Sequence, residues 1–82
     1  MGIDERIRVE AYSGHRIEET PRSFVLHGNK VGITEIVDMW IEEGLKDKKR
    51  KRFFKVRGSD GILYEIYMNE KTEEWFIRKI FL

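Results

Sequence analysis

Turn-forming residues divide this chain into short segments in which apolar and polar side chains alternate, and this pattern limits the possible folds more than any other feature. The stretch RIRVEAY, residues 6–12, alternates strictly, as a half-buried strand does. Gly28-Asn29 and the Ser59-Asp60-Gly61 triplet separate later segments. Such residues suit tight hairpin turns because glycine and asparagine adopt positive φ at little cost. The pattern predicts consecutive antiparallel strands.

Six strands are expected from this alternation and from the β-branched and aromatic content of the segments. They cover residues 6–12, 22–27, 31–43, 52–57, 62–68 and 74–82. In the fifth of these, Ile62, Tyr64, Ile66 and Met68 are expected to face inward.

Residues 31–43 also fit a helix. In that interpretation Thr34 caps a helix over residues 34–43, which Gly44 ends. Read as a strand, the segment places Val37, Met39 and Ile41 on one face, with Glu35 as an exception. A short apolar stretch cannot be assigned by periodicity alone, but its isoleucines and tryptophan and the tight turn before it favour a strand.

The expected fold is therefore all-β, a small antiparallel meander that curls into an open barrel of about five to six strands. The alternative is an α+β fold with a helix at residues 34–43. The length of 82 residues predicts a single domain, residues 1–82. A domain of this size has a small core, so most of its ten aromatic residues must contribute to it.

Composition gives no sign of export. The chain has no cysteine, its first residues lack the apolar stretch of a signal peptide, and no segment is apolar over the length needed to span a bilayer. We therefore expect a cytoplasmic protein. Charged residues make up 38% of the chain, a proportion that fits a heat-adapted source.

One segment is strongly basic. Residues 46–55, KDKKRKRFFK, hold seven of the sixteen lysines and arginines, so an otherwise mildly acidic molecule has one cationic segment. Lysine and arginine bind phosphates, and exposed aromatic rings stack on unpaired bases, so this segment is a candidate nucleic-acid site. The candidate residues are Lys46, Lys48, Lys49, Arg50, Lys51, Arg52, Trp40 and Phe53. The alternative is that these charges are solvated and keep the hairpin from aggregating.

No pattern predicts catalysis, a cofactor or a metal site. His15 and His27 are not spaced as ligands of a known motif, and His15 beside Ser13 is not accompanied by an oxyanion-hole motif. The adjacent pairs of glutamates point to opposite faces of a strand and are expected in solvated positions. We expect a protein that is not an enzyme and acts by binding, with no small-molecule substrate.

A second kind of partner is suggested by apolar residues that alternation places outside the core. One residue of the Trp75-Phe76 pair must face outward, and an outward set that includes Trp75, Leu63 or Tyr67 would form an apolar patch. The apolar terminus, residues 80–82, adds to this. These features predict a protein-interaction or homodimerisation surface, made by an exposed apolar face or a sheet edge.

The stretches RVEAYSGHRIEETPRSFVLHG, EIVDMW, FFKVRGSDGILYEIY and TEEWFI resemble a family of small bacterial domains of uncharacterised function. A related module is similar to the C-terminal portion of some accessory proteins that resemble Y-family DNA polymerases. The resemblance covers most of the chain and implies an all-β fold and a strand at residues 31–42. It implies no activity and no catalytic residues, and the basic run KDKKRKR is not part of its pattern.

Overall fold

The computed structural model describes residues 4–12, 20–46 and 49–82, and these form six antiparallel strands with no helix. The strands are β1 (Glu5–Tyr12), β2 (Thr20–Leu26), β3 (Asn29–Glu43), β4 (Arg50–Gly58), β5 (Leu63–Asn69) and β6 (Trp75–Phe81). The all-β prediction is confirmed, and residues 34–43 are strand. No helix in the described part of the chain is long and apolar enough to cross a membrane.

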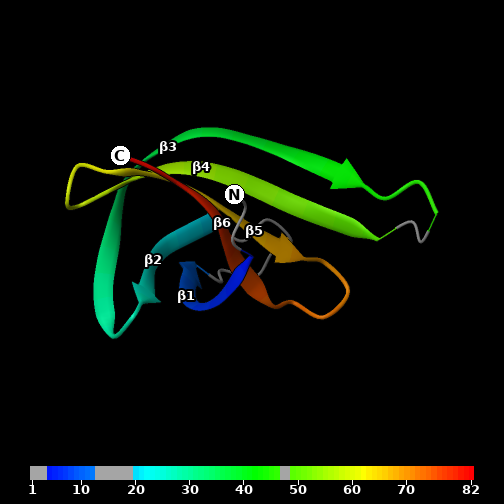
Figure 1. Cartoon of the computed structure of the whole chain (residues 1–82), viewed down its shortest axis with the longest axis horizontal. Coiled ribbons are helices and arrows are strands. Elements are labelled where there is room, and N and C mark those ends of the chain that lie inside the picture. Colours follow the sequence, from blue (N-terminus) through cyan, green and yellow to red (C-terminus); the bar gives the residue numbers. More distant parts are fainter. Residues whose placement is uncertain (1–3, 13–19, 47–48) are drawn as a thin grey trace.

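The sheet closes on itself in the order of the sequence, where the alternation predicted an open barrel. Closure comes from β1, whose first residues pair with β6 and whose later residues pair with β2. Strand β3 also changes partner: residues 29–32 pair with β2, and residues from Ile33 onward pair with β4. Figure 1 shows the resulting bend in β3 and the long β3–β4 hairpin that extends past the other strands.

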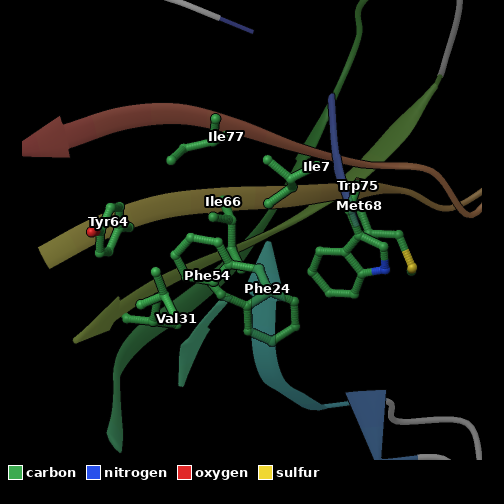
Figure 2. Packing of buried hydrophobic residues seen from close by; sticks show 10 residues of the cluster. Ile7, Phe24, Val31, Phe54, Tyr64, Ile66, Met68, Trp75 and Ile77 are labelled. Atoms are coloured by element: carbon green, nitrogen blue, oxygen red, sulfur yellow. The ribbon is translucent and has the colours of Figure 1, made fainter. Parts of the chain in front are cut away.

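The inside of the barrel is filled by apolar side chains from all six strands (Figure 2). The buried cluster consists of Ile7, Phe24, Val31, Phe54, Val56, Tyr64, Ile66, Met68, Trp75 and Ile77. Strict alternation explains the positions from β4 and β5. The prediction that Tyr64, Ile66 and Met68 face inward is confirmed, and Ile62, just before β5, is partly buried against the same cluster. Trp75 also faces inward, so it is not part of an outward apolar patch.

Two bulges interrupt the alternation of β3, at the register shifts between Ile33 and Glu35 and between Ile36 and Asp38. Each bulge adds one residue opposite a single residue of β4 and bends the strand. Ile33 and Ile36 therefore both pack against the core, and Glu35 is exposed. Because of the second bulge, Ile36 faces the core opposite Val56, whereas Trp40 lies on the outside of the barrel opposite Phe53.

Two hairpin turns use glycine as expected, but the β2–β3 turn consists of His27 and Gly28 rather than Gly28 and Asn29, because Asn29 already pairs with Leu26. Gly28 and Gly61 have φ values of 82° and 84°, which other residues rarely adopt. Gly58 is confined in a different way, because it lies where β4 meets the turn to β5. A Cβ there would lie 2.7 Å from Val31 Cγ1 and 2.9 Å from Tyr64 Cε1.

We predict that Gly58→Ala lowers the free energy of unfolding by about 1–3 kcal/mol, because the added methyl group overpacks the barrel. Gly32→Ala is the matched control, since a Cβ on this strand glycine meets its nearest neighbour, Ser59 Oγ, at an ordinary 3.7 Å. It should change stability by no more than about 0.5 kcal/mol. Urea unfolding of both variants measures the difference, and equal effects would contradict the packing at Gly58.

Candidate nucleic-acid interface

The basic segment lies at the end of the hairpin formed by β3 and β4. The Gly44 N–H donates to the Lys49 carbonyl at 3.0 Å and closes the last hydrogen-bonded pair of the hairpin. Beyond it, Leu45 is 97% exposed and the Lys46 side chain is also in solvent. Lys48 lies outside the described residues. The hairpin thus carries its cations away from the barrel (Figure 1).

Strand alternation divides the cations of β4 between two faces, so the basic segment is not one continuous surface. Arg50 and Arg52 share a face and both pair with Glu70 of the β5–β6 turn, at 3.4 and 3.0 Å. Lys51 points to the other face, with its Nζ 5.3 Å from the centroid of the Tyr67 ring. Among the residues that the structure describes, the exposed cations nearest the tip are Lys46 and Lys49.

The outer face of the sheet carries a row of four aromatic rings, one from each of β3 to β6. Strand pairing sets Trp40 opposite Phe53, Phe53 opposite Tyr67, and Tyr67 opposite Phe76. The centroids of successive rings are 5.4, 4.8 and 5.2 Å apart. Cross-strand aromatic pairs of this kind stabilise a sheet and fix its register.

Two residues of the row, Phe53 and Tyr67, are buried although they point away from the barrel interior. Phe53 is 1% exposed because Trp40 stacks beside it and the Arg78 guanidinium lies 4.1 Å from its ring centroid. It therefore offers no face to a nucleic-acid base. Trp40 is half-buried, and its indole N–H donates to Glu42 Oε2 at 3.0 Å.

Arg78 joins the aromatic row to two carboxylates. It contacts Glu65 at 2.5 Å and Glu42 at 3.2 Å, the second being 36 positions away in the sequence. Glu65 is only 6% exposed, so this cation neutralises a buried charge on the outer face. The hydrogen bond from Trp40, and then those from Arg78, hold the pKa of the Glu42 carboxyl below its ordinary value.

The remaining titratable side chains give no catalytic or metal-binding arrangement within the described part of the chain. His27 pairs with Glu5, with Nε2 and Oε2 2.8 Å apart, while His15 and Ser13 lie outside the described residues. Among residues 4–12, 20–46 and 49–82, no group of three or more His, Cys, Asp and Glu side chains could hold a metal ion.

Sequence reasoning did not find Arg78, Glu42 or Glu70. These residues contact the candidate side chains: Glu70 pairs with Arg50 and Arg52, Arg78 covers Phe53, and Glu42 accepts a hydrogen bond from Trp40. Their roles depend on which residues lie opposite one another across strands, and alternation within one strand does not contain that information. The one available signal was the adjacent pair Glu42-Glu43 beside Trp40, because one of two neighbouring side chains on a strand must share the face of residue 40.

Comparison with known proteins gives no match to this chain among protein-family models, curated proteins or solved structures.

We predict that Arg78→Met lowers the free energy of unfolding by about 2 kcal/mol, because it leaves the buried Glu65 carboxylate without its cation. Glu42→Gln is the control at the exposed end of the same network. It keeps an acceptor for Trp40 and should cost less than about 0.5 kcal/mol. Thermal or urea unfolding distinguishes the two, and an Arg78→Met protein of unchanged stability would show that Glu65 is solvated.

Tyr64 and Tyr67 of β5 should ionise only at high pH in the folded protein. Burial, followed by the nearby Asp4 carboxylate, raises the pKa of Tyr67 to about 12, and burial with the hydrogen bond to Asp60 raises the pKa of Tyr64 to about 12. Because the folded pKa values exceed the unfolded value of about 10, the stability they contribute is complete below pH 10 and is lost as pH rises toward 12. Phenolate absorbance should show a step near pH 12 that Tyr67→Phe reduces and that denaturant moves to about 10. Ionisation of Tyr67 in the folded protein near pH 10 would contradict its burial.

Proposed function

We propose that this chain is a non-catalytic binding module and that the tip of its β3–β4 hairpin binds the phosphates of nucleic acid. The observation that carries the proposal is the position of the cations. Lys46 and Lys49 are exposed at the end of a hairpin that extends beyond the barrel. Lys51 follows in β4, two residues after Lys49. A cationic projection of this kind can approach a phosphate backbone without a matching concave surface.

The two arginines would contribute less than their charge suggests. Arg50 and Arg52 already pair with Glu70, so a phosphate would have to compete with a carboxylate for them. Trp40 is the one aromatic side chain of the hairpin that is still partly open to a base, whereas Phe53 is covered. The interface is therefore mainly electrostatic, which favours binding with little sequence preference.

The resemblance to a module of polymerase-like accessory proteins is consistent with a role near DNA. It adds no residue to the proposal, because the basic run is not part of the family pattern. The proposal therefore depends on the cations of the hairpin.

A second candidate function is protein interaction, and a separate observation favours it. Val37, Met39 and Ile41 of β3 are 45%, 57% and 48% exposed, values unusual for apolar side chains of a strand. Ile80, Phe81 and Leu82 form a further exposed apolar group at the end of the chain.

We predict that single-stranded oligonucleotides bind the protein with an affinity that falls steeply with salt. Replacing Lys46, Lys49 and Lys51 together by Ser should reduce the magnitude of the log–log salt slope by about 2, since each phosphate contact contributes roughly 0.7 to 0.9. Tryptophan fluorescence follows the titration, because Trp40 lies on the hairpin while Trp75 is buried inside the barrel.

The matched control removes the same number of positive charges elsewhere, by replacing Arg8, Lys30 and Lys79 by Ser. These residues belong to β1, β3 near the β2–β3 turn, and β6, and their side chains lie away from the hairpin tip. If both triple variants lost oligonucleotide affinity equally, net charge alone would explain the loss, and the hairpin would not be the binding site. A wild-type protein that binds no oligonucleotide in dilute salt would exclude the proposed function.

A further inference from the structure

Most of β3 is an edge strand although it belongs to a closed barrel. After Gly32 it leaves β2, and from Ile33 to Glu43 its only partner in the described part of the chain is β4. Figure 1 shows this portion of β3 beside β4, with no labelled strand on the side of β3 that faces away from β4. Edge strands carry unpaired N–H and C=O groups that can accept another strand.

The hydrogen-bond pattern identifies which groups are free. Gly44 and Lys49 form a hydrogen-bonded pair, and such pairs alternate with non-hydrogen-bonded ones in an antiparallel ladder. Counting back from Gly44, the backbone groups of Met39, Ile41 and Glu43 point away from β4. The hydrogen bond from the Met39 N–H to its neighbour Asp38 Oδ1, at 2.8 Å, agrees with this assignment, because that N–H has no carbonyl opposite.

The side chains beside these groups combine apolar surface with negative charge. Met39 and Ile41 are about half exposed, and Asp38, Glu42 and Glu43 are also in solvent. The strand that already pairs with the other edge of β3 is basic: Lys55 stands opposite Asp38, Lys51 opposite Glu42, and Arg50 opposite Glu43. Opposite charges across a pair of strands stabilise it, so β4 shows which composition β3 prefers in a neighbour.

We infer that the free edge of β3, from Met39 to Glu43, binds an extended segment of a partner protein in which basic and apolar residues alternate. The segment would add a strand to the sheet, with its backbone hydrogen-bonded to Ile41 and Glu43. Its apolar side chains would cover Met39 and Ile41, and its cations would face the carboxylates of Asp38 and Glu42, which alternation places on the opposite face of β3. This is recognition by strand addition, and it goes beyond the nucleic-acid binding proposed for the hairpin tip.

Charge decides against a second copy of the chain as the occupant. Residues 35–43 of each copy carry four carboxylates, at Glu35, Asp38, Glu42 and Glu43, and no cation. A strand pair made from two such segments would bring eight carboxylates together with no cation in either segment. Repulsion between these charges disfavours self-association at this edge.

The experiment uses a capped synthetic peptide, acetyl-KVKVKVK-amide, as the probe, with NMR of isotopically labelled full-length protein. Binding should slow hydrogen exchange of the Ile41 amide by about tenfold or more, because a new hydrogen bond must open before exchange. The Trp40 amide, which the ladder already directs to β4, should change little. The acidic peptide acetyl-EVEVEVE-amide should not bind.

Two arms separate strand addition from simple charge attraction. The first is a basic peptide with N-methylated valines, which keeps every charge but lacks the donors for an added strand. The second is Ile41→Pro, which removes an outward N–H and is compatible with an edge position. Each should weaken binding by about tenfold or more, equivalent to about 1.4 kcal/mol. Ile41→Ala, which keeps the N–H, should bind much more tightly than Ile41→Pro.

Equal binding of the plain and N-methylated basic peptides would overturn the inference, and this arm does not depend on whether Ile41→Pro folds. Binding of the acidic peptide would overturn it too, as would light scattering that shows a dimer which Ile41→Pro dissociates. The lysine variants of the hairpin tip should still bind the peptide. A protein that fails to bind oligonucleotides but binds the peptide would exclude the proposed function alone.

Discussion

The two extra residues in β3 determine how the rest of the molecule is arranged. Without the bulges at the register shifts near Thr34 and Val37, a strand of this length would run straight and stay beside one pair of neighbours. With them, its first part pairs with β2 in the barrel and its second part leaves with β4. The barrel core, the projecting hairpin and the unpaired edge are consequences of that one bend.

A chain this short gains stability by burying apolar surface on both faces of its main sheet. The inner face fills the barrel, and the outer face carries the row from Trp40 to Phe76 under the Lys51 ammonium and the Arg78 guanidinium. Cations suit this position because they are attracted to the negative face of an aromatic ring. The burial of Glu65 on the same face is tolerated because Arg78 neutralises it.

Local patterns were sufficient to predict the strands but not their relation to one another. Gly28 and Gly61 marked turns, and alternation in β5 placed Tyr64, Ile66 and Met68 inside, because these features depend only on neighbours in the sequence. Phe53 was expected at the surface, and it is covered because Arg78, 25 positions later, lies on its ring. Register, bulges and barrel closure arise from the summed packing of all six strands, so a single segment does not encode them.

The hairpin separates two surfaces of opposite charge within a few residues, and this limits what each can bind. A phosphate backbone lying along the free edge of β3 would meet Asp38, Glu42 and Glu43, so its approach is confined to the tip and to the side of Lys51. For a basic partner peptide the charges act in the opposite way: the carboxylates of β3 attract it, and Lys46 and Lys49 repel it from the hairpin tip. Strand alternation thus gives one hairpin two distinct binding chemistries, and neither requires a pocket.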